Sequence, residues 1–330
     1  MKGTLLPPDQ VAAAIVEGRH LLLAADERLL TWLPAGNWIG GSIPYFMSEN
    51  GAQRTNRSIY VEELPESIVS CQMSLYDANS VEKIYQDAPR NGFSVVIIPA
   101  MSKTHLRFAL DAPRFPGFAT RPLVGWISGV DLGDIGRTSA KIFTGLDPRS
   151  RPDGAVAMHV TLPAHQYAEI GIVNIFTQDE AESIVFPQDG FAAREAIIDG
   201  KAEDFAAFLR RKGHDMRLPL VADYCGAKIN VSFEHIDEAG GKVTFYAPVF
   251  ANVTYRLARP VPEYGKVFRD ALGAVGSDDL CYNCILNYLY GRFETQNTGT
   301  ISFPCTFGEV AYQLLNQTLV HLAIRDLRKD

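Results

Sequence analysis

The sequence lacks the features that place a chain in a membrane or on a nucleic acid. It contains no run of about 18 apolar residues, which a membrane-spanning helix requires. Its first ten residues, MKGTLLPPDQ, hold prolines and an aspartate where a secretory signal needs an unbroken apolar segment. The net charge is −7, whereas nucleic-acid binding needs a basic surface. We therefore expect a cytoplasmic protein with no membrane and no nucleic acid as its partner.

Cysteine is scarce, and its spacing does not form a metal site. The odd number and the lack of an export signal favour reduced thiols. Cys281 and Cys284 form a C-x-x-C pair, but no second pair supplies the other ligands of a structural zinc ion. Packing in an apolar segment explains this pair better than a metal or a redox dithiol. We expect no metal and no cofactor. The five cysteines are Cys71, Cys225, Cys281, Cys284 and Cys305.

Nucleotide-binding glycine motifs are also missing. The richest glycine stretch is GNWIGGSIPYFMSENG, residues 36–51. Gly36, Gly40 and Gly41 do not have the spacing of G-x-G-x-x-G, and Pro44 disfavours a helix directly after them. No G-x-x-x-x-G-K-[ST] motif occurs. This stretch is therefore a turn between buried segments or a wall of a pocket for another kind of ligand.

The 330 residues, of which 47% are hydrophobic, are enough for two domains or one large layered unit. Helical spacing predicts two helices in residues 8–34, divided at Gly18, while 278–293 fits either a buried strand or a helix. Further helices are expected at 103–110, 200–213 and 262–276. Strands are expected at 57–63, 91–100, 122–130, 155–163, 171–178, 227–236, 240–249, 252–260 and in the last part of the chain.

These elements do not alternate as in a doubly wound parallel sheet. They favour a mixed α/β (α+β) fold, in which mixed and largely antiparallel sheets are covered by helices. We expect two related halves, residues 1–195 and residues 196–330. The boundary is placed before the helix predicted at 200–213.

An internal echo supports two related halves. SIPYFMSENGAQRTNRS (42–58) aligns without gaps to SFPCTFGEVAYQLLNQT (302–318). Both segments follow an apolar stretch and lead into an apolar strand after an asparagine. The alignment favours a duplicated structural unit over coincidence. The identical pairs are Ser42 and Ser302, Pro44 and Pro304, Glu49 and Glu309, Gln53 and Gln313, and Asn56 and Asn316.

The second copy resembles the end of the FIST signal-sensing domain. That family has a Gly-aromatic-x-x-x-Gly-Glu-Ile turn followed by an Asn-Gln-Thr-Leu strand, and this chain has TFGEV at 306–310 and NQTL at 316–319. Upstream segments such as PLVGWISG (122–129) resemble the family in the same order. Leu315 replaces the usual histidine, which indicates a divergent member. The resemblance implies a cytoplasmic sensory module that binds small molecules such as amino acids, here without a fused output domain.

The candidate binding residues come from the two echoing segments. Glu309 and Glu49 could bind an ammonium group or form an acid–base pair, or each could cap its own turn. Asn316 and Asn56 could orient a ligand carboxylate, or form local Asx-turns. Cys284 could act as a nucleophile if a base lies within reach. The full set expected at the site is Trp38, Ser42, Tyr45, Glu49, Asn56, Cys284, Ser302, Cys305, Phe307, Glu309 and Asn316.

Two functions follow from these residues. The first is a sensory protein that binds an amino acid or a similar polar metabolite and signals through a separate protein. The alternative is a hydrolase or lyase that uses the same cleft, with Glu309 or Cys284 as its reactive group. A mainly structural or oligomeric module, including a homodimer, is left open.

Overall fold

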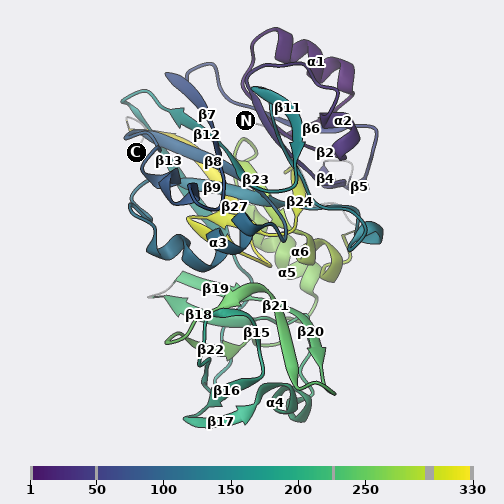
Figure 1. Ribbon diagram of the computed structural model, residues 1–330, viewed down its shortest axis with the longest axis vertical. Coiled ribbons are helices and arrows are strands. Elements are labelled where there is room, and N and C mark those ends of the chain that lie inside the picture. Colours follow the sequence, from purple (N-terminus) through teal and green to yellow (C-terminus); the bar gives the residue numbers. More distant parts are fainter. Residues whose placement is uncertain (1–2, 49–50, 225–226, 294–300, 328–330) are drawn as a thin grey trace.

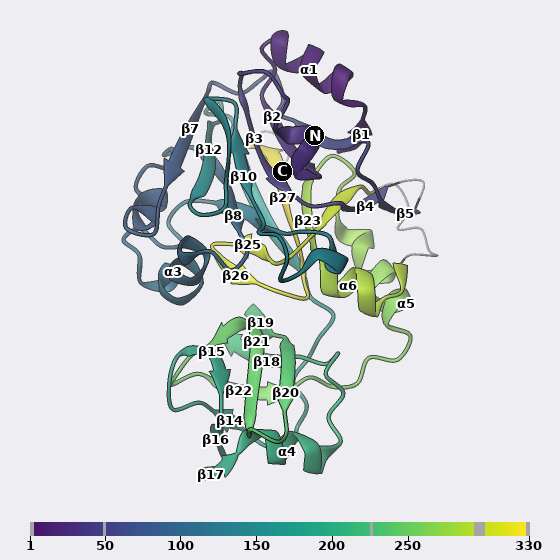
Figure 2. The same ribbon diagram turned by 45° about the vertical axis from the view of Figure 1, so that its right-hand side comes forward.

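A computed structural model describes residues 3–48, 51–224, 227–293 and 301–327. Strands dominate, and they form mixed and antiparallel sheets, which confirms the predicted mixed α/β class. Two lobes are visible in Figure 1 and Figure 2. We call residues 178–262 the small lobe, because its strands pair only with one another in the described sheets, and the remainder the large lobe.

Within the described residues, the large lobe contains three six-stranded sheets. The first has the order β1 (Thr4–Leu6), β6 (Ile59–Glu63), β2 (Leu21–Ala25), β3 (Trp38–Ser42), β10 (Ile142–Thr144), β11 (Asp147–Arg151). The second has the order β26 (Gln313–Leu315), β25 (Glu309–Ala311), β9 (Leu123–Ser128), β8 (Gly92–Pro99), β12 (Ala155–Thr161), β7 (Ser70–Tyr76). The third has the order β13 (Gln166–Val173), β27 (Leu319–Asp326), β23 (Leu280–Cys284), β24 (Phe303–Thr306), β4 (Tyr45–Ser48), β5 (Gly51–Arg54).

The small lobe has two sheets of its own. One has the order β17 (Lys201–Asp204), β16 (Glu195–Ile198), β14 (Ile184–Val185), β22 (Thr254–Leu257), β18 (Leu220–Tyr224), β19 (Ala227–Val231). The other has the order β15 (Gly190–Ala193), β21 (Lys242–Val249), β20 (Phe233–Asp237). The division expected between residues 195 and 196 differs from this arrangement, because it falls inside β16. Strands β23–β27 return to the large lobe, and such long-range pairing leaves no local signal in the sequence.

Local sequence explains where the helices begin and end. The Ser102 side chain accepts a hydrogen bond from the His105 amide at the start of α3 (Lys103–Asp111), as an N-cap does. The Asp204 side chain does the same at α4 (Phe205–Lys212), which ends at Gly213 with φ +59°. The remaining α-helices are α1 (Pro8–Val16), α2 (Glu27–Leu30), α5 (Tyr264–Ala271) and α6 (Ile285–Tyr290).

The prediction of two helices in residues 8–34 is wrong in its second part. Helix α1 ends before Gly18, but Leu21–Ala25 forms β2, and only the short helix α2 follows. All five residues of β2 are buried. A short apolar run buried on both faces has no periodicity, so sequence pattern does not separate a strand from a helix there. The ambiguous segment 278–293 contains both kinds of element, β23 followed by α6.

The glycine stretch at 36–51 forms strands rather than a phosphate-binding loop. Trp38–Ser42 is β3 and Tyr45–Ser48 is β4. A Cβ atom on Gly41 would lie 2.6 Å from Trp126 Cη2 and 2.7 Å from Ile97 Cγ2, both on the facing sheet. Gly41 therefore allows β3 to approach that sheet closely.

The two echoing segments lie side by side, because β4 pairs antiparallel with β24. The pairing pattern around them is also repeated. Strand β2 pairs parallel with β3 and antiparallel with β6, and β23 pairs parallel with β24 and antiparallel with β27. A helix precedes and another follows the first strand of each set. This agreement supports the predicted duplication.

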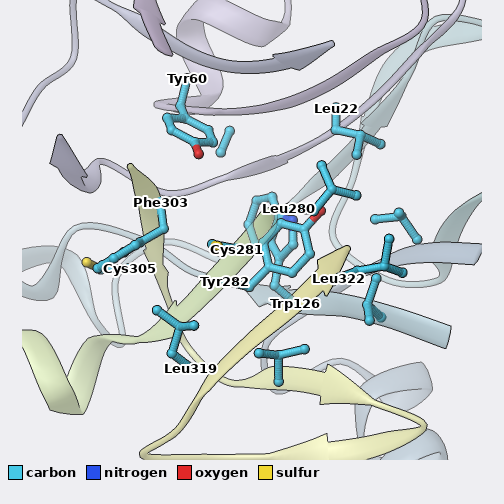
Figure 3. Packing of buried hydrophobic residues seen from close by; sticks show 14 of the residues in the cluster. Leu22, Tyr60, Trp126, Leu280, Cys281, Tyr282, Phe303, Cys305, Leu319 and Leu322 are labelled. Atoms are coloured by element: carbon cyan, nitrogen blue, oxygen red, sulfur yellow. The ribbon is translucent and has the colours of Figure 1, made fainter. Parts of the chain in front are cut away.

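The main core joins both ends of the chain (Figure 3). Tyr60 from β6 and Tyr282 from β23 are fully buried in it. The Tyr282 hydroxyl donates a hydrogen bond to the buried carboxyl group of Glu62 at 3.2 Å, and the Tyr60 hydroxyl lies 3.3 Å from the same carboxyl group. Burial nevertheless raises the pKa of Glu62 to about 8. Cys281 packs in the same cluster, and alternation along β23 separates its side chain from Cys284. The C-x-x-C pair is therefore part of a strand.

Replacing Gly41 with alanine tests the close approach of β3. We expect Gly41→Ala to lower the free energy of unfolding by about 1–3 kcal/mol, because the added methyl group overpacks the core against Trp126. Urea denaturation followed by circular dichroism measures the change. Gly273→Ala is the matched control, since a Cβ atom there has no neighbour within 4 Å. Equal midpoints for the two variants would contradict the packing argument.

Candidate functional site

The strongest candidate site lies in the large lobe where three strands end beside the small lobe. Cys284 is the last residue of β23 and the N-cap of α6. Glu309 begins β25, and Asn316 lies between β26 and β27. The three residues are 1%, 0% and 1% exposed, respectively. The fold thus buries three residues that the sequence analysis selected, and contacts described below join them.

The carboxyl group of Glu309 is only partly satisfied. Its Oε2 atom accepts hydrogen bonds from the backbone amide of Thr318, at 3.3 Å, and from the Thr318 hydroxyl, at 2.6 Å. Its Oε1 atom has no hydrogen-bond partner within the described parts of the chain. Burial raises the pKa of Glu309 well above its ordinary value, although the bonds from Thr318 and the neighbouring Cys284 thiol oppose the shift. Burial therefore favours the protonated form of Glu309.

The Cys284 thiol is adjacent to this carboxyl group. Burial raises the pKa of the thiol well above its ordinary value, and Glu309 adds to the increase. The backbone amides of Gln317 and Leu286 lie against the sulfur and oppose the shift. Burial therefore favours the neutral thiol over the thiolate.

Asn316 joins the two lobes. Its Oδ1 atom accepts a hydrogen bond from the Ser232 amide at 3.1 Å and lies 3.0 Å from the Ser232 hydroxyl. The Ser232 hydroxyl also lies 2.6 Å from Gln317 Oε1, and Asn230 donates to the Gln317 carbonyl at 3.3 Å. The Nδ2 atom of Asn316 is buried and has no partner among the described residues. The Asx-turn interpretation of Asn316 is therefore replaced by a lobe-to-lobe contact.

A cavity of about 70 Å³ lies beside these groups. Cys284 and Asn316 supply polar atoms to its wall, and Tyr246 reaches it from the small lobe. The rest of the lining is apolar, and Phe307 is the one member of it that the sequence analysis also selected. Glu309 is not part of the lining. The apolar residues are Leu132, Ile135, Ile285, Leu286, Leu289 and Phe307.

Several other predicted site residues have structural roles. Trp38 is buried, and its indole donates to the Pro34 carbonyl. The Ser42 hydroxyl donates to the Gly129 carbonyl at 2.7 Å. The Tyr45 hydroxyl accepts from the Leu132 amide at 3.1 Å. These three residues hold strands and loops of the large lobe together, and they do not line the cavity.

The remaining predicted residues also lie apart from the cavity wall. The Ser302 carbonyl accepts a hydrogen bond from Tyr60, and Cys305 is fully buried in the main core. Asn56 is exposed in the connection from β5 to β6. Glu49 lies outside the described residues, so its predicted pairing with Glu309 stays a prediction.

Three residues at the site were missed by the sequence analysis. Thr318 binds Glu309, Ser232 binds Asn316, and Tyr246 closes the cavity. Thr318 could have been found, because it follows the selected Asn316 by two residues and faces Ser58 in the internal alignment. Ser232 and Tyr246 belong to the small lobe, and no pattern in the sequence places them beside β25 and β27.

No group of three or more His, Cys, Asp or Glu side chains in the described residues is arranged to hold a metal ion. Over the same residues, no helix is long and apolar enough to cross a membrane.

The fold and the site define a two-lobed mixed α/β protein with a small cavity at the contact between its lobes. The chain belongs to DUF6976, a family of unknown function, whose model matches residues 6–325. A search of the curated proteins finds no significant match. The resemblance to FIST domains stays a prediction.

The raised pKa of Glu309 has a consequence for stability. A carboxyl group with a raised native pKa binds its proton more tightly when folded, so folding stability falls as pH rises above the unfolded value of about 4.5. Glutamine mimics the protonated form and does not ionise. We expect Glu309→Gln to match the wild type near pH 5 and to gain about 1.4 kcal/mol per pH unit above that value, up to the native pKa.

Urea denaturation at a series of pH values measures this difference. Glu169→Gln serves as a control, because Glu169 is exposed and forms a surface ion pair with Arg325. A difference between Glu309→Gln and the wild type that does not change with pH would show that Glu309 is ionised in the native protein.

Proposed function

We propose that the protein is a small-molecule-binding sensory protein whose ligand occupies the cavity between the lobes. The observation that carries this proposal is that Asn316, a residue of the cavity wall, has a buried Nδ2 atom with no partner among the described residues. A buried N–H group without a partner costs free energy, and a ligand acceptor would recover it. The Cys284 thiol supplies a second, weaker polar contact.

The lining indicates the kind of ligand. Apolar side chains dominate the wall, and its polar groups are neutral. A cavity of about 70 Å³ admits only a small group, so the bound group is compact, with an apolar part and a carbonyl or carboxylate oxygen toward Asn316. A small amino acid or a similar metabolite fits this description. Glu309 would contact the Cys284 thiol and not the ligand itself. This role differs from the direct contact with a ligand ammonium group that the sequence analysis considered for Glu309.

The lobe contact offers a route from binding to signalling. The Asn316 side chain accepts a hydrogen bond from Ser232 of the small lobe, and Asn316 is also one of the residues that line the cavity. A ligand that binds Asn316 and Tyr246 together would favour one arrangement of the lobes. We propose that a separate protein in the cytoplasm recognises that arrangement.

An enzyme that uses Cys284 is the second candidate. The thiol lies at a strand-to-helix junction, two backbone amides face its sulfur, and the Glu309 carboxyl group is adjacent. These amides would stabilise a thiolate, and Glu309, once ionised, could accept its proton. Burial and the raised pKa of both groups oppose catalysis. A binding role is therefore favoured.

A panel of amino acids and small carboxylic acids, screened by thermal denaturation, tests the proposal. A true ligand should raise the melting temperature in proportion to the logarithm of its concentration and be recovered unchanged. Asn316→Asp keeps the acceptor for Ser232 but removes the N–H donor, so we expect at least about tenfold weaker binding. Asn56→Asp, at the matching exposed position of the other segment, should bind normally.

Cys284→Ala separates the two candidate functions. A binding protein should retain most of its affinity, whereas an enzyme should keep binding its substrate and lose turnover. Cys71→Ala controls for the loss of a thiol, because Cys71 lies on β7 and does not line the cavity. A ligand whose affinity is the same in wild type, Asn316→Asp and Cys284→Ala would rule out this cavity as the site.

A further inference from the structure

A second and larger cavity lies at the other side of the lobe contact, where the chain passes from the small lobe into α5. It is an open groove of about 570 Å³. Arg217 lines it from the small lobe, and Tyr264, Lys266 and Arg269 line it from α5 and its first turn. Tyr290 and Arg292 complete it at the end of α6. We call this cavity the basic groove.

Positive charge is in excess in the basic groove. Its lining contains four cationic side chains and two carboxylates, although the chain as a whole has a net charge of −7. Arg217 is paired with Asp215, at 2.6 Å, and the other lining carboxylate, Glu263, has no ion pair among the described residues. Lys266 forms an ion pair with Asp270 at 2.7 Å. Both side chains are exposed, and such surface pairs contribute little to folding stability.

Two arginines of the groove have no carboxylate partner. Neither Arg269 nor Arg292 forms an ion pair with any described residue. The Nη1 atom of Arg269 is buried, and it has no hydrogen-bond partner in the described part of the chain. A buried guanidinium N–H that is left unpaired is costly, and a phosphate oxygen would satisfy it with a charge-assisted bond. Arginine also binds phosphate through two parallel hydrogen bonds.

The groove also presents aromatic surface. The rings of Tyr264 and Tyr290 lie with their centroids 6.5 Å apart at 82° to one another. Both residues line the groove, so an aromatic ring system could stack on one of them and contact the edge of the other. Stacking of a nucleic-acid base on an aromatic side chain is worth about 1–3 kcal/mol.

We propose that the basic groove binds an organic phosphate that carries a flat ring, such as a nucleoside monophosphate. The phosphate lies against Arg269, Lys266 and Arg292, and the ring lies on Tyr264 or Tyr290. The volume of about 570 Å³ is within the range of small-molecule sites. This site is separate from the cavity beside Cys284, and it does not depend on the ligand proposed there.

Isothermal titration calorimetry with the full chain tests this inference at low ionic strength, where charged contacts are least screened. The probes are adenosine monophosphate, adenosine and inorganic phosphate. We expect saturable binding of adenosine monophosphate, with at least about tenfold weaker binding of adenosine and of inorganic phosphate, because each lacks one of the two recognised parts. Failure of adenosine monophosphate to bind more tightly than inorganic phosphate would overturn the assignment of an organic phosphate.

Variants locate the site. Arg269→Gln should weaken binding of adenosine monophosphate by at least about tenfold through loss of a charged hydrogen bond. Arg292→Gln changes an exposed side chain, so it provides the same test if the first variant folds poorly. Arg90→Gln is the control, because Arg90 is exposed and does not line the groove. Unchanged binding in both groove variants would overturn the proposal, whatever the outcome at the cavity beside Cys284.

Discussion

The segment Asn316–Thr318 is the contact on which the rest of the molecule depends. All three side chains are buried, and each is bonded in a different direction. Asn316 holds Ser232 of the small lobe, and Thr318 holds Glu309. The Gln317 amide donates to the Arg217 carbonyl at 2.6 Å and to the Tyr264 hydroxyl at 3.2 Å. Because a buried polar group that loses its partner costs free energy, these bonds fix the lobes, the candidate site and one wall of the basic groove together.

This arrangement also sets the chemistry of the candidate site. Burial raises the pKa of both Glu309 and Cys284 well above their ordinary values, which favours the neutral form of each group. A neutral site distinguishes one ligand from another by shape and hydrogen bonding more than by charge. The basic groove differs from this cavity, because cationic side chains outnumber carboxylates in its lining. The lobe contact therefore combines a neutral cavity with a charged groove. A chain of hydrogen bonds connects the two: the Tyr264 hydroxyl donates to Asn287 at 2.6 Å, and Asn287 donates to the Thr318 carbonyl.

Sequence reasoning predicted the fold class and the existence of α4. The predicted start of that helix at residue 200 is wrong, because Lys201–Asp204 forms β17 and the helix begins after its Asp204 cap. It also selected Cys284, Asn316, Phe307 and Glu309, which lie in or beside the candidate site. Sequence pattern did not separate β2 from a helix, because a run buried on both faces has no period. It also did not find the small lobe as an insertion, since the strands on either side of it pair across more than a hundred residues. Partners that come from that insertion, such as Ser232, leave no local signal.

The small lobe explains why the matching asparagines of the two echoing segments differ in burial. Each segment leads through an asparagine into a strand, β6 or β27, that pairs in the same way with its neighbours. Asn56 is nevertheless exposed, whereas Asn316 is buried. The difference lies in what covers each turn, because the small lobe packs on the second copy through Ser232 and Asn230. The covering lobe therefore determines that Asn316, and not Asn56, is buried and bonded across the lobe contact.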